Sequence, residues 1–256
     1  SEEKMRQIRG RDIGMVFQEP MTALNPVLTI KEQIYEAFED KGYTNGEKRD
    51  RAIDALRLVG IPSPEVRLGE YAHQFSGGMR QRAMIAIALA AEPCILLADE
   101  LTTALDVTIQ DQIMKLLNRL RQQLGMSIVL VTHDLGVVAQ MCDRLAVMYA
   151  GFVMEVCDVI TLFSSPRHPY TYGLLCSLPH GRDTGSKLQP IGGAPPDLGA
   201  LPPGCPFVPR CQFRERQCVL SLPELQEVTP GHFSRCHFLD KMEGIPGIID
   251  SEDLQQ

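Results

Sequence analysis

The sequence predicts an α/β fold built around a parallel β-sheet, and three observations support this expectation. Residues 94–98 have the length and composition of a buried parallel strand, and residues 127–132 form a second β-rich apolar run. Each run ends in polar residues that could bind a ligand, an Asp-Glu pair in the first and a His-Asp pair in the second. Helix-forming segments separate the runs, an alternation that is typical of a parallel sheet with helical connections.

The first strand is expected near residue 12, where a β-rich apolar run leads into Gln18. A glutamine before a proline-containing turn carries no functional signal by itself. Two helical stretches follow, at about 29–41 and 46–59. Together with the next helix they would form a helical subdomain over about residues 27–92.

The segment Ser76-Gly77-Gly78-Met79 precedes a run of strong helix formers that is closed by Pro93. Ser76 is a good N-cap residue. The glycines would let a phosphate approach the backbone N–H groups at the positive end of the helix dipole. A flexible turn is the commoner explanation for a bare Ser-Gly-Gly sequence.

Asp99 and Glu100 stand at the carboxyl end of the 94–98 strand, where α/β folds place their ligands. Because Mg²⁺ prefers one or two carboxylates plus phosphate oxygens, Asp99 is a candidate magnesium ligand. Glu100 is a candidate for orienting or deprotonating a water molecule. An isolated Asp-Glu pair would more simply be a solvated strand end.

Asp106 precedes an amphipathic helix that we expect to end at Gly125. His133 follows the 127–132 strand, a position where a lone histidine is more often packed or capping than catalytic. A short helix comes next, and then two strands within residues 145–157 that complete the α/β core near residue 160.

Four motifs occur in a fixed order within 60 residues: FSGGMRQR at 75–82, CILLADE at 94–100, TALD at 103–106 and VTHD at 131–134. In this order they resemble the signature helix, Walker B strand, D-loop and switch histidine of ABC-type ATPases. Gln18 then resembles the Q-loop glutamine. The resemblance implies an ABC-type P-loop ATPase core that uses ATP and Mg²⁺.

The resemblance also implies a role for each site residue. Glu100 would act on the attacking water, His133 would contact the γ-phosphate and hold Glu100, and Gln18 would join Asp99 at Mg²⁺. The remaining nucleotide-binding residues would complete the site of a second ABC ATPase subunit, identical or different: Ser76, Gly77, Gly78, Met79 and Asp106.

The sequence departs from the family pattern at two points. None of the 256 residues forms a G-x-x-x-x-G-K-[ST] loop, the motif that cradles the β- and γ-phosphates. We therefore expect an ABC core that lacks its N-terminal strands, continues upstream into such a loop, and is inactive without it. The alternative is a non-catalytic partner that supplies only its signature motif in trans.

The second departure is Leu101, which stands where the family has proline. The loss of that proline frees the local backbone.

After the core, residues 168–179 (HPYTYGLLCSLP) and the Gly/Pro-rich residues 191–204 resemble the C-terminal extension of oligopeptide and dipeptide importer ATPases. We therefore divide the chain into an ABC domain, 1–160, and an extension, 161–256. The resemblance implies a peripheral subunit on the cytoplasmic face of the bacterial inner membrane. Its partners would be two membrane permease subunits and, indirectly, an extracytoplasmic peptide-binding protein. An importer of nickel or another small solute and an ABC protein without a membrane partner are the alternatives.

Four cysteines of the extension are spaced C-x5-C-x6-C-x17-C: Cys205, Cys211, Cys218 and Cys236. A cytosolic protein keeps its thiols reduced, so a metal is favoured over disulfides. A [4Fe–4S] cluster, which the resemblance favours, zinc, and thiols without metal all remain open, because the spacing does not choose between them. The other four cysteines lie in apolar runs and are expected in the core: Cys94, Cys142, Cys157 and Cys176.

Composition narrows the class of protein. The chain is 44% hydrophobic and 22% charged, as in ordinary globular proteins, and its net charge is −7. It has no basic cluster interleaved with aromatic residues, so nucleic acid is not an expected partner. The longest apolar run, at 84–91, is far shorter than the roughly 20 residues of a membrane-spanning helix.

Overall fold

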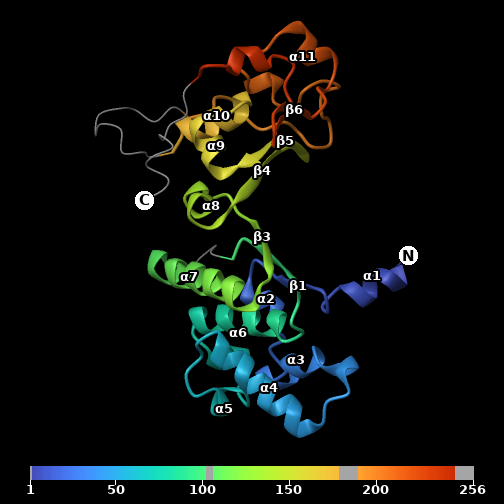
Figure 1. Cartoon of the computed structure of the whole chain (residues 1–256), viewed down its shortest axis with the longest axis vertical. Helices are drawn as coiled ribbons and strands as arrows, with labels where there is room; N and C mark the ends of the chain where they lie inside the picture. Colours follow the sequence, from blue (N-terminus) through green and yellow to red (C-terminus); the bar gives the residue numbers. More distant parts are fainter. Residues whose placement is uncertain (1, 102–105, 179–189, 246–256) are drawn as a thin grey trace. The chain divides into compact units, whose positions relative to one another are not determined.

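The computed structural model describes residues 2–101, 106–178 and 190–245. The chain forms two compact units, residues 1–135 and 136–256 (Figure 1). None of the described helices has both the length and the apolar character needed to cross a membrane.

The first unit contains a parallel three-stranded sheet in the order β1-β2-β3. Its strands are β1 (Ile13–Val16), β2 (Ile95–Asp99) and β3 (Ser127–Val131), and the register aligns Val16 with Ala98 and Asp99 with Val131. Because all three strands run the same way, the residues that follow them meet at one edge of the sheet. The predicted parallel sheet is confirmed for these three strands.

The two faces of this sheet differ in burial. On one face Val16, Leu96 and Ala98 are buried, and α6 (Gly77–Leu89) packs against β1. Gly14 permits this contact, since a Cβ atom there would lie 2.7 Å from the carbonyl oxygen of Ala88. The opposite face carries exposed apolar side chains at Met15, Val129 and Val131.

Short helices pack against α6 and form a helical layer with their own core (Figure 1). Two of them begin with capping boxes, Thr29 with Glu32 and Thr44 with Glu47. The core contains Ile34, Phe38, Leu56 and Ile85. The elements of this layer are α2 (Pro20–Ala23), α3 (Ile30–Glu36), a 3₁₀ turn (Glu39–Lys41), α4 (Asn45–Leu58), α5 (Pro64–Arg67) and a 3₁₀ turn (Ala72–Gln74).

Three more helices belong to this part of the chain. The amphipathic helix is confirmed as α7 (Val107–Leu124), which buries one apolar stripe and ends at Gly125 with φ at +64°. An exposed helix, α1 (Glu2–Ile8), was not expected from the sequence. The short helix α8 (Leu135–Met141) begins at the boundary between the units.

The second unit contains a separate four-stranded sheet in the order β4-β5-β7-β6. Its strands are β4 (Arg144–Tyr149), β5 (Phe152–Asp158), β7 (His232–Ser234) and β6 (Gln226–Thr229), and every pairing is antiparallel. The two strands predicted within residues 145–157 are confirmed as β4 and β5. They belong to this antiparallel sheet and not to the sheet of the first unit, and β5 pairs with β7 of the extension.

The extension surrounds this sheet with short elements. Its apolar core includes Tyr149, Met154 and Phe207, and the rings of Tyr149, Tyr170 and Phe207 lie against one another. The elements are α9 (Val159–Ser164), α10 (Pro169–Cys176), a 3₁₀ turn (Val208–Arg210), α11 (Arg216–Leu220) and a 3₁₀ turn (Leu239–Met242). The predicted boundary at residue 160 stays a prediction.

Candidate active site and cysteine pocket

The candidate catalytic carboxylate, Glu100, is held by two side chains from the neighbouring strand ends. Nε2 of Gln18, which follows β1, donates to Oε2 of Glu100 at 2.6 Å. Nδ1 of His133, which follows β3, lies 3.1 Å from Oε1. The structure therefore brings together the three residues that the sequence predicts to be catalytic. The parallel pairing of β1, β2 and β3 brings these residues to one edge of the sheet, although 82 positions separate Gln18 from Glu100.

The backbone fixes Glu100 beside β3. Its N–H donates to the carbonyl oxygen of Val131 at 2.9 Å, which extends the ladder between β2 and β3 by one residue. Glu100 has φ at +42°, a conformation that non-glycine residues rarely adopt. A following proline would favour an extended Glu100 instead. Leu101, which stands where the family has proline, is 1% exposed and therefore part of the core.

Asp99, the candidate magnesium ligand, is the last residue of β2 and is half-buried. A carboxylate at this position can offer oxygen atoms to a hard cation, so the donor chemistry fits Mg²⁺. Its assignment as a ligand stays a prediction.

The predicted signature motif forms the start of α6. Ser76 is the N-cap, and its Oγ accepts from the N–H of Met79 at 3.4 Å. The space around Gly77 is open, since no atom lies within 4 Å of the position a Cβ would take. A Cβ at Gly78 would lie 3.4 Å from Ile109, so the motif adjoins the start of α7. The backbone N–H groups here are therefore accessible at the positive end of a 13-residue helix.

Asp106 is the N-cap of α7, and its side chain accepts from the N–H of Ile109 at 2.9 Å. The rest of the predicted D-loop, residues 103–105, lies outside the described residues. The assignments of the signature motif and of Asp106 to nucleotide binding stay predictions.

Two polar contacts next to His133 could not be anticipated from the sequence. Nε2 of Gln110, on α7, donates to Oδ2 of Asp134 at 3.1 Å. The N–H of Asp134 donates to Oγ1 of Thr132 at 3.0 Å. Through these contacts the turn that contains His133 is attached to α7, the helix that follows the D-loop. No motif or periodicity in the sequence marks Gln110 for this role.

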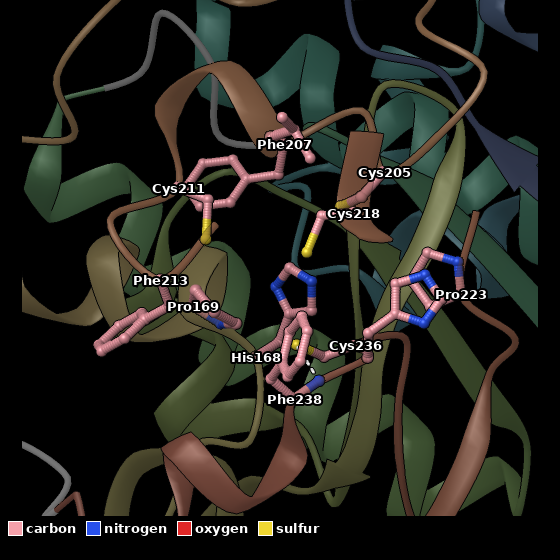
Figure 2. A pocket seen from close by; sticks show the side chains of 12 residues that line it. His168, Pro169, Cys205, Phe207, Cys211, Phe213, Cys218, Pro223, Cys236 and Phe238 are labelled. Carbon is pink, nitrogen blue, oxygen red and sulfur yellow. Dashed lines mark hydrogen bonds between the residues drawn. The ribbon is translucent and has the colours of Figure 1, made fainter. Parts of the chain in front are cut away.

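The four predicted cysteines line one apolar pocket in the second unit (Figure 2). Cys205 and Cys218 are buried, whereas Cys211 and Cys236 are partly buried. Phenylalanine rings and the buried imidazole of His168 complete the lining. Segments that are far apart in the sequence thus deliver four thiols to one place, which satisfies the first requirement of a metal centre.

The backbone brings two of these cysteines together. The N–H of Cys205 donates to the carbonyl oxygen of Cys218 at 2.8 Å. A Cβ atom at Gly204 would lie 2.1 Å from that same oxygen, so only glycine fits there. No motif in the sequence indicates this role for Gly204.

Burial disfavours the thiolate form of three of these cysteines: Cys205, Cys211 and Cys236. Burial, followed by smaller effects of neighbouring thiols, raises the pKa of Cys211 and of Cys236 to about 11, and burial also raises the pKa of Cys205. Backbone N–H groups act in the opposite sense, and that of Phe238 donates to Sγ of Cys236 at 3.5 Å. A bound cation would favour the thiolates, so the donor set fits a metal or an iron–sulfur cluster.

The prediction that Cys94 is a core residue was wrong. Its side chain is exposed, and Sγ contacts the carbonyl oxygen of Asp12 at 3.2 Å. β2 begins at Ile95, so Cys94 lies just before the strand rather than inside it. Cys157 is buried as predicted, and Cys142 and Cys176 are partly buried.

Two family models match the chain. The model described as "ABC transporter" matches residues 1–103, and the model described as "Oligopeptide/dipeptide transporter, C-terminal region" matches residues 154–218. The match to the second model agrees with the family suggested by the extension.

Curated proteins match over most of the chain. The dipeptide transport ATP-binding protein DppD of Bacillus subtilis (strain 168) is 50% identical over 242 residues, which cover 94% of this chain and 72% of that protein. A candidate peptide import ATP-binding protein of Brucella melitensis is 51% identical over 242 residues, 92% of this chain and 72% of its own length.

Solved ABC cassettes share the fold. The dimeric ATP-binding cassette MJ0796 bound to ADP and phosphate superimposes with a TM-score of 0.54 at 33% identity, over 62% of this chain and 68% of that one. The protein cbiO1 of Clostridium perfringens, part of the transporter complex cbiONQ, gives a TM-score of 0.57 at 31% identity, over 64% of this chain and 63% of that one.

Proposed function

This chain belongs to the family of ABC transporter ATP-binding proteins of peptide importers, and from that premise we propose that it is the ATP-hydrolysing subunit that energises the import of dipeptides or oligopeptides. The observation that carries the proposal is the placement of Glu100 between Gln18 and His133 at the carboxyl edge of a parallel sheet.

In this proposal Glu100 is the general base for hydrolysis of ATP. Its carboxylate accepts the proton of the attacking water and keeps that water in line with the γ-phosphate. The imidazole of His133 steadies Glu100 and donates to the phosphate oxygens as negative charge develops there. The amide of Gln18 holds the other carboxylate oxygen and reports on the state of the site.

Asp99 and Gln18 would hold Mg²⁺, whose charge would neutralise the phosphate oxygens of the bound nucleotide. The nucleotide would lie between two subunits. The second subunit would contribute its own signature segment, Ser76 to Met79, together with Asp106. Open backbone around Gly77 supports this role, because a phosphate can approach the start of α6 without meeting a side chain.

The 256 residues contain no G-x-x-x-x-G-K-[ST] sequence. Since that loop supplies the backbone cradle for the β- and γ-phosphates, we propose that residues 1–256 by themselves do not hydrolyse ATP. A cradle supplied by an added N-terminal segment would complete the site.

The subunit would act peripherally on the cytoplasmic face of the inner membrane, against two permease subunits. An extracytoplasmic binding protein would deliver the peptide. When ATP drives the closure of two such subunits, the segment that follows Gln18 would transmit the movement to the permeases. In the structure this segment carries exposed Met21 and Val27, apolar side chains that suit a protein partner.

The four cysteines of the pocket would hold a [4Fe–4S] cluster. Four cysteine thiolates are the usual ligands of such a cluster, and the convergence of four thiols on one pocket supports the proposal. A single zinc ion held by the same four thiolates is the alternative.

Replacement of the matching segment of the B. subtilis protein DppD by residues 1–256 tests the function. The fusion would keep the part of that relative that lies outside the matching segment, where we expect the phosphate loop. It should then restore dipeptide import in cells that lack the native subunit. The same fusion with Glu100→Gln is the inactive control. A fusion that hydrolyses ATP when purified but supports no dipeptide uptake would contradict a role in peptide import.

A further inference from the structure

A second candidate metal site lies in the sheet of the second unit, separate from the cysteine pocket. Glu155 and Cys157 are two residues apart on β5, so their side chains point to the same face. The antiparallel register aligns Glu155 with Ser234, and two further positions along it place His232 of β7 opposite Cys157. Three potential ligands from two strands therefore share one face.

These three side chains converge in the interior. One carboxylate oxygen of Glu155, Sγ of Cys157 and one ring nitrogen of His232 all lie within 4.8 Å of one another. Glu155 and Cys157 are fully buried, and His232 is 3% exposed. Solvated surface groups often approach one another without consequence, but buried polar groups need partners.

The hydrogen bonds at this place leave one carboxylate oxygen unsatisfied. Oε1 of Glu155 accepts from the N–H of Arg167 at 2.5 Å and lies 2.7 Å from Nε2 of His232. Oε2 is buried and has no hydrogen-bond partner among the described residues. An unpaired oxygen on a buried carboxylate is costly, and a cation held by the same carboxylate would lower that cost.

From this arrangement we infer that Glu155, Cys157 and His232 form a site for a divalent transition metal of the zinc type. One carboxylate, one thiolate and one imidazole are ligands that zinc accepts together, and three protein ligands leave a fourth position for water. The deprotonated carboxyl and thiol groups carry two negative charges, which balance the charge of the ion inside the protein.

Binding would require a small local change. The ion would replace the hydrogen bond between Nε2 of His232 and Oε1 of Glu155, so the neutral imidazole would carry its proton on Nδ1 instead of Nε2. The thiol of Cys157 would release its proton to solvent as the metal–sulfur bond forms. Ligands of tetrahedral zinc lie about 3.3 Å apart when the bonds are about 2.0–2.1 Å long, so the 2.7 Å contact would widen by roughly 0.6 Å. The ion would then link β5 to β7, joining residues 77 positions apart.

Zinc titration of metal-stripped protein tests this site. Cys157→Ser and Glu155→Gln should each lose one equivalent of bound zinc, with an affinity at that site reduced by about 100-fold or more. Cys176→Ser, at the end of α10 and outside both groups, is the matched control and should lose none. Cys157→Ser that binds as much zinc as the unaltered protein, with equal affinity, would overturn the inference.

Binding of Co²⁺ to a variant of the cysteine pocket distinguishes the two metal sites by absorption spectroscopy. This test remains informative if Glu155→Gln or Cys157→Ser does not fold. Cys211→Ser disables the cysteine pocket but leaves Cys157 intact. That variant should still bind one Co²⁺ and show the charge-transfer absorption of a single thiolate ligand. Complete loss of cobalt binding in Cys211→Ser would assign all the metal to the pocket and reject the second site.

Discussion

Gln18 donates a 2.6 Å hydrogen bond to the carboxylate of Glu100, although the two residues belong to different strands of the sheet. Gln18, which we propose senses the nucleotide, is therefore hydrogen-bonded directly to Glu100, which we propose activates water. A displacement of Gln18 by a membrane partner would release one oxygen of the catalytic base.

Glu100→Gln should abolish hydrolysis and preserve ATP binding in the fusion that carries a phosphate loop. The amide cannot accept the proton of the attacking water, and loss of a general base costs about 10²- to 10⁴-fold in turnover. Steady-state turnover and nucleotide binding are the two measurements. Glu36→Gln, an exposed change on α3, is the control. Turnover of Glu100→Gln within a few-fold of the unaltered fusion would place the base elsewhere.

Residues 1–256 by themselves should aggregate on heating without a sharp cooperative transition. The sheet of the first unit exposes Met15, Val129 and Val131 on one face, and β3 has an unpaired edge among the described residues. Exposed apolar surface of this kind favours association. Val129→Thr combined with Val131→Thr should reduce light scattering during the scan. A soluble monomer with one sharp calorimetric transition would show that this face needs no cover.

The cysteine pocket should yield a brown protein after anaerobic purification, with four irons per chain and broad visible absorbance. Cys211→Ser should lose the colour, and Cys94→Ser, an exposed cysteine of the first unit, should retain it. One zinc per chain in place of iron would correct the identity of the metal. Four thiols that alkylate freely in the folded protein, with no stoichiometric metal, would eliminate the centre.

Gly204→Ala should destabilise the second unit by about 1–3 kcal/mol, because the added methyl group meets the carbonyl oxygen of Cys218. It should also lower the metal content, since Cys205 and Cys218 would be forced apart. Thermal unfolding and metal analysis report the two effects. Gly192→Ala, where a Cβ meets no atom within 4 Å, is the control. Equal stability of the two variants would mean that the backbone relaxes around the clash.

The family resemblance, not the strand pattern alone, selected Gln18, Glu100 and His133. Each of the three follows an apolar strand, and parallel strands end at one edge of a sheet, so their meeting there could be expected from the sequence. The contact of Gln110 with Asp134 could not be predicted, because it depends on how α7 packs.

The sequence also did not show which sheet β4 and β5 would join. Their apolar pattern is the same for a parallel and an antiparallel sheet, and the strands that decide the matter, β6 and β7, are short and partly polar. Likewise, the cysteine spacing suggested a metal but did not show that four thiols converge. That convergence depends on the close passage of the backbone at Gly204.

The pairing of β5 with β7 has a consequence for the exchange of parts between relatives. β5 precedes the extension in the sequence, yet it hydrogen-bonds to a strand near the extension's far end. A hybrid joined at residue 160 would therefore combine edges from two different proteins within one sheet. A junction placed before Arg144 would transfer all four strands of this sheet from one parent protein. We expect such a hybrid to fold more readily than one joined at residue 160.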